Sequence, residues 1–158
     1  MRIIDGYNLI GAAGEFGIAL SMPDKEDRLL RLLASFRSRR RSNQALLVVF
    51  DGDYGRLAAG PRRYTQLGIA VEWTLGETAD TLIARKVRAA ARPREIEVVT
   101  SDESVLRAIA SSGARGVRCP AFLAEISRAL VDEPAAEKPE ASSPAEVAEW
   151  LERFGDGR

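Results

Sequence analysis

Short apolar runs that each lead into an acidic residue constrain the fold of this chain more than any other feature. Residues 3–4, 46–50 and 96–101 lead into Asp5, Asp51 and Asp102, respectively. Apolar runs of this length, separated by helical patterns, are typical of buried parallel strands. Parallel strands bring their carboxyl ends to one edge of a sheet, where open α/β folds bind their ligands. We therefore expect these three carboxylates to lie close together.

Two further acids are expected at the same edge. Glu77 and Asp80 follow the apolar segment 71–73, and a spacing of three would place both on one face of a helix. Crowded carboxylates repel one another unless a cation neutralises them, and hard oxygen ligands favour Mg²⁺ or Mn²⁺. The sequence thus predicts a divalent-metal site. An alternative for Glu77 is a capping box with Thr74, and a similar box would pair Thr100 with Glu103.

The rest of the chain alternates strand and helix patterns, which predicts an α/β fold with a mainly parallel sheet and helices on both faces. Strands are expected at 2–5, 45–50, 69–73, 95–100 and 116–118. Helices are expected at about 25–40, 77–91, 103–112 and from Pro120 to about Val131. The glycine-rich stretch before residue 25 is expected to be a loop, and 51–67 a turn followed by a short segment.

Histidine is absent from the 158 residues. Its absence excludes histidine-dependent triads, histidine-based ribonuclease chemistry and zinc sites that use imidazole. Any hydrolysis needs another way to activate water, and a bound metal ion is the obvious one. The single cysteine, Cys119, excludes an intramolecular disulfide and fits a reducing compartment; we expect it to be a small buried residue.

No apolar stretch approaches the roughly 20 residues of a membrane span. Asp5 and Asn8 interrupt the charged-then-apolar layout of a signal peptide at the N-terminus. We therefore expect a cytoplasmic protein with no membrane partner.

The zero net charge hides two parts of opposite sign. Residues 1–130 carry 20 basic and 15 acidic side chains, whereas 131–158 carry 3 and 8, and 20 of the 23 basic residues are arginine. Arginine binds phosphates in a bidentate manner, so the basic body predicts binding to a polyanion; a coding bias toward arginine is the alternative. The candidate RNA contacts, expected beside the acids, are Arg37, Arg39, Arg40, Arg41, Arg62 and Arg63, with Tyr7 or Tyr54 to stack on a base. A basic helix end that complements the helix dipole is the simpler explanation for the first four.

The C-terminal segment differs in composition from the body. Residues 132–143 are rich in Pro, Ala and Glu and are expected to form a linker. At 144–158, apolar residues spaced three and four apart predict a short amphipathic helix. Such a helix is too short to be stable alone in water, so it docks on its own domain, on a second copy or on another protein; a frayed, mostly disordered tail is the alternative. We favour docking on the body, because the charges are complementary.

Several residues at the expected site have simpler explanations. Asp5 and Asn8 are ordinary turn formers. Either Asp51 or Asp53 completes the acidic edge, and the other then belongs to the turn. Thr100 and Ser101 are expected to orient the acids or a bound water.

Four motifs occur in an order that resembles the NYN-domain ribonucleases of the YacP-like branch, in the PIN-like superfamily. They are Asp5-Gly6-Tyr7-Asn8, Val49-Phe50-Asp51, Glu77-Thr78-Ala79-Asp80 and Thr100-Ser101-Asp102. The resemblance covers about residues 1–130 and leaves the acidic C-terminal segment outside; we expect the nuclease domain to comprise residues 1–131. The resemblance implies a PIN-like three-layer fold with strand order 3-2-1-4-5, and Mg²⁺- or Mn²⁺-dependent endoribonuclease activity. In-line attack by water would leave 5′-phosphate and 3′-hydroxyl ends.

The resemblance also implies roles for individual residues. Asp5, Asp80 and Asp102 match the principal metal ligands, Asn8 matches a polar neighbour in the opening motif, and Glu77 and Asp51 match supporting positions. After Asp51 the chain continues Gly-Asp-Tyr instead of the more usual alanine-rich sequence, which leaves the role of Asp53 open. Two other functions remain: a non-catalytic RNA-binding adaptor of the same fold, and a phosphatase that uses Asp51 and Asp53 as nucleophile and acid.

Overall fold

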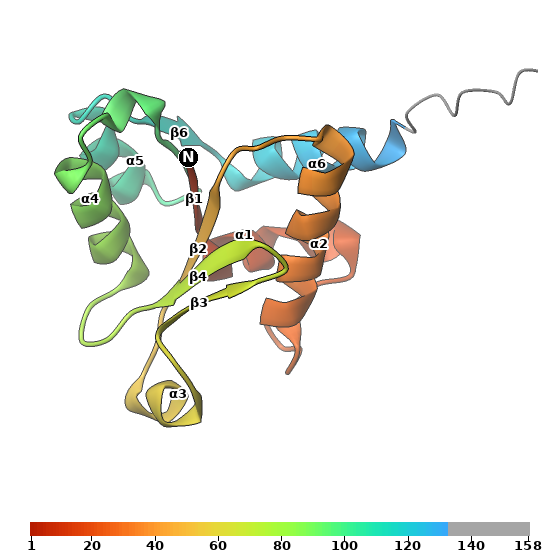
Figure 1. The fold of residues 1–158 in the computed structure, drawn as a ribbon, viewed down its shortest axis with the longest axis horizontal. Coiled ribbons are helices and arrows are strands. Elements are labelled where there is room, and N and C mark those ends of the chain that lie inside the picture. Colours follow the sequence, from red (N-terminus) through yellow and green to blue (C-terminus); the bar gives the residue numbers. More distant parts are fainter. Residues whose placement is uncertain (133–158) are drawn as a thin grey trace, which may run out of the picture.

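A six-stranded sheet lies at the centre of the computed structural model, which describes residues 1–132 (Figure 1). Its strands are β1 (Arg2–Asp5), β2 (Leu46–Phe50), β3 (Arg63–Gln66), β4 (Ile69–Trp73), β5 (Glu97–Val99) and β6 (Arg115–Val117). Their order is β3-β4-β2-β1-β5-β6, and every neighbouring pair is parallel except β3 and β4. The predicted order 3-2-1-4-5 is confirmed, since the five expected strands are β4, β2, β1, β5 and β6 in that arrangement.

The edge strand β3 was not predicted as a strand. It pairs antiparallel with β4 through a two-residue turn at Leu67 and Gly68, both of which have positive φ angles, 51° and 73°. Two-residue hairpin turns favour Asn-Gly or Gly-Gly because both positions need positive φ. Because leucine occupies the first turn position, the sequence lacks the pattern that predicts such a hairpin.

Helices cover both faces of the sheet, as predicted (Figure 1). On one face lie α1 (Gly6–Ala12), α2 (Lys25–Arg40) and α6 (Cys119–Val131); on the other lie α4 (Ala79–Ala89) and α5 (Glu103–Ala110). Helix α3 (Tyr54–Ala59) and the 3₁₀ turns Gly14–Phe16 and Pro93–Glu95 belong to the connections. The prediction of a loop before residue 25 is wrong for residues 6–12, which form α1 directly after β1.

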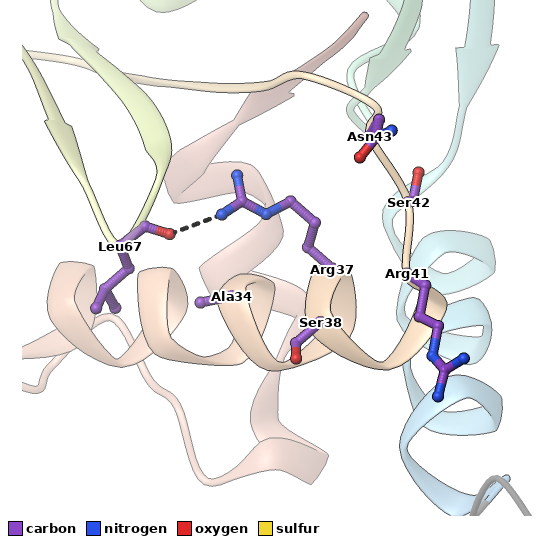
Figure 2. A pocket seen from close by; sticks show the side chains of 7 residues that line it. All are labelled: Ala34, Arg37, Ser38, Arg41, Ser42, Asn43 and Leu67. Atoms are coloured by element: carbon purple, nitrogen blue, oxygen red, sulfur yellow. Dashed lines mark hydrogen bonds between the residues drawn. The ribbon is translucent and has the colours of Figure 1, made fainter.

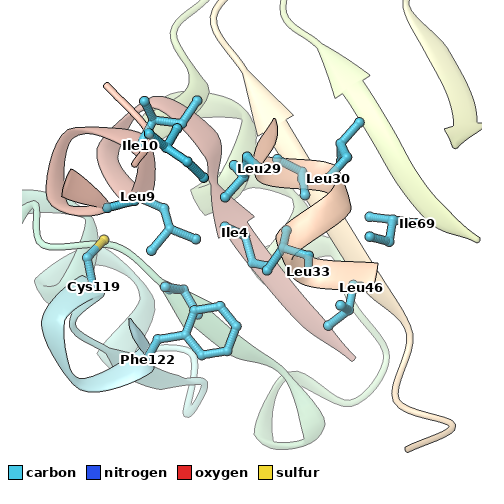
Figure 3. Close-up of a cluster of buried hydrophobic side chains, with 14 of the residues drawn as sticks. Ile4, Leu9, Ile10, Leu29, Leu30, Leu33, Leu46, Ile69, Cys119 and Phe122 are labelled. Atoms are coloured by element: carbon cyan, nitrogen blue, oxygen red, sulfur yellow. The ribbon is translucent and has the colours of Figure 1, made fainter. Parts of the chain in front are cut away.

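The larger core lies between the sheet and helices α1, α2 and α6 (Figure 3). Ile4, Leu29, Leu33 and Phe122 are fully buried there, and Phe36 packs edge-on against Phe122 at 5.4 Å between ring centroids. The apolar stripe of α2 supplies the leucines, which explains why its predicted bounds match its observed ones. Truncating a fully buried leucine to alanine typically costs about 2–5 kcal/mol.

The second core lies under α4 and α5 and includes Ile3, Val49, Leu82 and Ile109. Ile3 and Ile4 belong to different cores because successive side chains of a strand point to opposite faces. Both faces of β1 are therefore buried, as the uninterrupted apolar runs in the sequence predict.

An ion-pair group anchors the amino end of β1. Arg2 is 6% exposed, pairs with Glu97 at 2.6 Å and Glu125 at 3.3 Å, and lies over the Phe122 ring. These contacts tie β1 to β5 and α6. Burial would raise the pKa of Glu97, but Arg2 and Arg115 outweigh that effect and lower it.

No helix in the part of the chain that the structure describes is long and apolar enough to cross a membrane. The predicted helix at 144–158 and the predicted linker after Asp132 lie outside the described residues.

Candidate active site at the carboxyl edge of the sheet

Four aspartates converge at the carboxyl edge of the sheet. Asp5 ends β1, Asp51 follows β2, Asp102 lies between β5 and α5, and Asp80 is the second residue of α4. The charges of Asp80 and Asp51 act on Asp5, and those of Asp102 and Asp51 act on Asp80. The structure thus brings together the carboxylates that the sequence predicted at one edge.

Asp5 is the most deeply buried of the four, with 5% of its surface exposed. Its side chain caps α1 by accepting the backbone N–H of Asn8 at 3.4 Å, and the Thr100 hydroxyl donates to its second oxygen at 3.4 Å. Burial raises its pKa to about 6; the Asn8 hydrogen bond opposes the shift, and Asp80 and Asp51 add to it. The surroundings of Asp5 therefore disfavour the ionised form of its carboxyl group.

Asp80 is close enough to Asp5, Asp51 and Asp102 for these carboxyl groups to influence its ionisation. Burial raises the pKa of Asp80, and the neighbouring charges of Asp102 and Asp51 raise it further. A bound cation would offset the repulsion between these carboxylates.

Asp102 has the opposite environment. As N-cap of α5, its Oδ1 accepts the Ser104 hydroxyl at 2.6 Å, the Ser104 N–H at 2.8 Å and the Val105 N–H at 3.2 Å. These hydrogen bonds, with the Ser104 hydroxyl first, lower the pKa of Asp102. Asp102 thus contributes a full negative charge near neutral pH. The predicted capping box between Thr100 and Glu103 is wrong, because Asp102 is the cap.

Asp51 fixes the start of helix α4. Its Oδ1 accepts the Ala79 N–H at 2.7 Å, while Thr78, the N-cap, accepts the Thr81 N–H at 3.2 Å. Asp51 thereby ties the end of β2 to the residue before Asp80. Its carboxylate already serves this structural role, and Asp53 lies exposed in the turn before α3.

Glycines follow Asp5 and Asp51 because other parts of the chain pass close to them. A Cβ on Gly6 would lie 2.3 Å from the Phe50 ring, and one on Gly52 would lie 2.5 Å from the Thr74 carbonyl oxygen. Thr74 is fully buried, and its hydroxyl accepts the Gly52 N–H at 3.0 Å. Sequence reasoning missed this role of Thr74; the Asp-Gly pairs were the signal that could have indicated a close approach.

Asn8 joins three segments behind the aspartates. Its Oδ1 accepts the Ser101 N–H at 2.7 Å and the Cys119 thiol at 3.2 Å, and the Cys119 N–H donates to the Ser101 hydroxyl at 3.1 Å. Thr100 completes the support, because its hydroxyl contacts Asp5 and accepts the Asp102 N–H at 3.1 Å. Cys119 is buried as predicted, but the sequence did not indicate its hydrogen bond to Asn8.

Glu77 does not share a helical face with Asp80, because α4 begins at Ala79. Its carboxylate instead pairs with Arg85 at 2.5 Å. The predicted capping box with Thr74 is also wrong, since Thr78 caps this helix.

The predicted RNA contacts divide between the two edges of the sheet. Arg37, Arg39, Arg40 and Arg41 end α2 at the amino edge, so the expectation that they lie beside the acids is wrong. A helix that links two parallel strands runs antiparallel to them, which carries its last turn away from the strands' carboxyl ends. Arg40 pairs there with Glu125 at 2.5 Å.

Arg62 and Arg63 do lie at the carboxyl end of β4. Arg62 donates to the Trp73 carbonyl at 3.1 Å, and Arg63 pairs with Glu72 at 2.9 Å. Tyr7 is half-buried, donates to Glu26 at 2.7 Å and packs against Phe50 at 5.2 Å between rings. Tyr54 is the first residue of α3, and its side chain is not among those that the structure describes.

The donor set at this edge fits a hard divalent cation by its chemistry, since it consists of carboxylate oxygens from four aspartates. As the side chains stand, no three acidic, histidine or cysteine residues within 1–132 are arranged to hold a metal ion. The acids are nevertheless close enough for the charges of Asp102 and Asp51 to raise the pKa of Asp80.

Comparison with known proteins identifies relatives of this fold. A crystal structure of Rae1 (YacP) from Bacillus subtilis is 27% identical over 98% of this chain and 92% of that chain, with a TM-score of 0.62. The W164L mutant of the same protein is 28% identical over 81% and 75% of the two chains, with a TM-score of 0.61. The comparison with curated proteins finds no match. The family model described as the YacP-like NYN domain matches residues 2–152, and the chain therefore belongs to the YacP-like NYN domain family.

Proposed function

We propose that this protein is a metal-dependent endoribonuclease. The observation that carries the proposal is the convergence of four aspartates at the carboxyl edge, with the pKa of Asp5 raised to about 6 by burial and by Asp80 and Asp51. Membership of the YacP-like NYN family makes RNA the natural substrate class. A cytoplasmic location fits both RNA and the free thiol of Cys119.

Asp5, Asp80 and Asp102 would hold Mg²⁺ or Mn²⁺, with Asp51 adjusting the site through its bond to α4. When bound, such an ion lowers the pKa of a water molecule and offsets the charge of a phosphate. Uncompensated carboxylates would repel the RNA backbone, so this edge can receive a phosphodiester only when its own charge is neutralised. Thr100 and Asn8 act as positioning residues, because they hold Asp5 and the loop of Asp102.

The reaction is hydrolysis of a phosphodiester bond. The oxygen of water forms a bond to phosphorus, the bond to the 3′-oxygen breaks, and that oxygen leaves with a proton. The products are a 5′-phosphate and a 3′-hydroxyl. The chain has no histidine to activate a 2′-hydroxyl, so a 2′,3′-cyclic product is not expected.

The test is cleavage of an end-labelled RNA with Mn²⁺ by the wild type, Asp80→Asn and the control Glu95→Gln. Glu95 is an exposed carboxylate beside Arg92, before β5 at the amino edge. We expect Asp80→Asn to reduce the rate about 100-fold or more, as losing a group that stabilises the transition state does, and Glu95→Gln to leave it unchanged. Cleavage that persists in EDTA, or a cyclic phosphate end, would contradict the proposal.

The alternative is a non-catalytic RNA-binding adaptor. The observation that favours it is that no three acidic or cysteine side chains within residues 1–132 are arranged to hold a metal ion. An adaptor would bind RNA in EDTA, cleave none with Mn²⁺, and bind equally well after Asp80→Asn. Mn²⁺-dependent cleavage that Asp80→Asn abolishes would exclude it.

A further inference from the structure

A pocket at the amino edge of the sheet lies where the end of α2 meets the turn between β3 and β4. Its volume is about 560 Å³, and it is lined by Ala34, Arg37, Ser38, Arg41, Ser42, Asn43 and Leu67. Figure 2 shows Leu67 at one end and Arg41 at the other, with Ala34 and Ser38 between them. No acidic side chain belongs to this lining.

Two lining residues have unusual backbone conformations. Arg41 and Leu67, with φ of 47° and 51°, are the non-glycine residues with positive φ in the described part of the chain. Such conformations are uncommon without glycine, and they cluster at functional sites. Arg41 occupies the C-cap of α2, where glycine is the usual choice, and Leu67 is 51% exposed. A cation and an apolar side chain are thus held at opposite ends of one pocket at a cost to the backbone.

Arg37 and Arg41 both give the pocket positive charge, and the guanidinium of Arg41 is the one not engaged in holding the turn. Arg37 donates to the carbonyls of Leu67 and Gly68, so its guanidinium holds the turn against α2. Among the described residues Arg41 has no ion-pair partner. The last carbonyls of α2 accept N–H groups from Arg41 and Ser42, which weakens their repulsion of an anion.

The edge strand β3 links this pocket to the candidate active site. Because β3 runs antiparallel to β4, its end at Gln66 lies beside the pocket and its start at Arg63 lies at the carboxyl edge. From edge to edge the five residues of β2 span about 17 Å at a rise of 3.3–3.4 Å per residue. The three strand spacings from β3 to β1, where Asp5 lies, add about 14 Å sideways. A single-stranded polymer can therefore contact both sites, whereas a mononucleotide contacts only one.

We propose that this pocket is a remote nucleotide subsite for single-stranded RNA, in which Arg41 binds a phosphate and Leu67 packs against a base. Ser38, Ser42 and Asn43 supply hydrogen bonds to the sugar and the base edge. This inference rests on the proposed function for its choice of RNA. The subsite holds a segment of the RNA several nucleotides away from the bond that is cut.

The test measures binding of an unstructured 30-nucleotide RNA by the full-length chain in EDTA, so that neither metal nor cleavage is needed. Arg41→Gly removes the cation and places glycine where the C-cap favours it. Leu67→Asn removes the apolar side chain and gives the turn an Asn-Gly pair, the sequence such turns prefer. Arg107→Ala, at an exposed arginine of α5, removes one charge elsewhere and is the matched control.

We expect Arg41→Gly to weaken binding roughly fivefold and to lower the salt slope by about 0.7, the value for one phosphate contact on a single strand. Leu67→Asn should weaken binding by a similar factor without changing the slope, and Arg107→Ala should change neither. An affinity of Arg41→Gly equal to that of wild type or of Arg107→Ala would overturn the subsite. An unchanged affinity of Leu67→Asn would overturn the base contact.

A parallel cleavage assay separates this proposal from the proposed function. With Mn²⁺, Arg41→Gly should slow cleavage of the 30-nucleotide RNA and leave cleavage of a dinucleotide unchanged, because a dinucleotide is too short to reach the subsite from the aspartates. If the wild type cleaves and Arg41→Gly binds normally, the subsite fails and the nuclease stands. If the wild type does not cleave but Arg41→Gly weakens binding, the nuclease fails and the subsite stands.

Discussion

Asp5 carries the largest electrostatic cost at the candidate site. Its carboxyl group is buried beside Asp80 and Asp51, and its pKa is raised to about 6. Between pH 4 and pH 6 the folded protein binds more protons at this group than the unfolded chain does, so the stability that Asp5 contributes falls as pH rises through this range. Well above pH 6 Asp5 is ionised in the folded protein and its full destabilising effect is present. A pKa shift of this size corresponds to about 3 kcal/mol of the free energy of unfolding.

Asp5→Asn should therefore stabilise the metal-free protein at pH 7.5, by about 1–2 kcal/mol after allowance for the altered Thr100 contact. The amide is isosteric, and its oxygen still accepts the Asn8 N–H. Urea denaturation in EDTA at pH 7.5 and pH 4.5 measures the difference, which should shrink at the lower pH. Mn²⁺ should reverse the order, since it stabilises only the wild type. A destabilised Asp5→Asn at pH 7.5 would show that the carboxylate is stabilised by its surroundings.

At the scale of elements, helix α4 depends on Asp51. The Asp51 carboxylate accepts the Ala79 N–H at 2.7 Å and so supplements Thr78 at the helix start. Asp51 thus has two effects: it fixes the start of the helix that carries Asp80, and its charge raises the pKa of Asp80. The two contributions separate by substitution, because asparagine keeps the acceptor oxygen and loses the charge.

Asp51→Ala should lower stability by about 1 kcal/mol, the usual cost of losing a capping acceptor, whereas Asp51→Asn should retain the cap. If Asp51 acts only through α4, Asp51→Asn keeps most of the cleavage activity and Asp51→Ala loses it. If Asp51 is a metal ligand, both variants need more Mn²⁺ to reach half-maximal cleavage. Urea denaturation and a Mn²⁺ titration of the rate distinguish the two cases.

The sequence predicted the elements that have long periodic or uninterrupted apolar patterns, and among the shorter elements it missed α1, α3 and β3. Helix α2 and the strands β1, β2 and β4 bury broad apolar faces, which leave a clear signal. Helix α1 buries only Gly6, Leu9 and Ile10. Strand β3 is an edge strand that pairs only with β4, and none of its residues is fully buried. The four aspartates were predictable because each follows a buried strand or starts a helix. The helical position of Glu77 was not, because Asp51 and Thr78 start α4 two residues later than the pattern suggests.

At the scale of the whole molecule, the charges divide between the body and the C-terminal segment. Residues 1–130 carry 20 basic and 15 acidic side chains, and 133–158 carry 3 and 7. The described chain ends at Asp132, which lines a pocket of about 290 Å³ with Arg39, Arg40, Arg128 and Glu125. The last described residue thus lies beside arginines of the amino edge. We propose that the acidic segment competes with RNA for this basic surface.

Deleting residues 133–158 should raise RNA affinity several-fold at 50 mM salt and have little effect at 0.5 M, where screening shortens the reach of the charges to a few ångströms. Both described cores lie within residues 1–132, so the shortened chain keeps them. Replacing Glu133, Glu137 and Glu140 with Gln keeps the length and removes three charges; it should reproduce part of the gain if charge is the cause. RNA affinity that is identical for the full chain, the deletion and the Gln variant would exclude competition, and an effect of the deletion alone would assign it to the bulk of the segment.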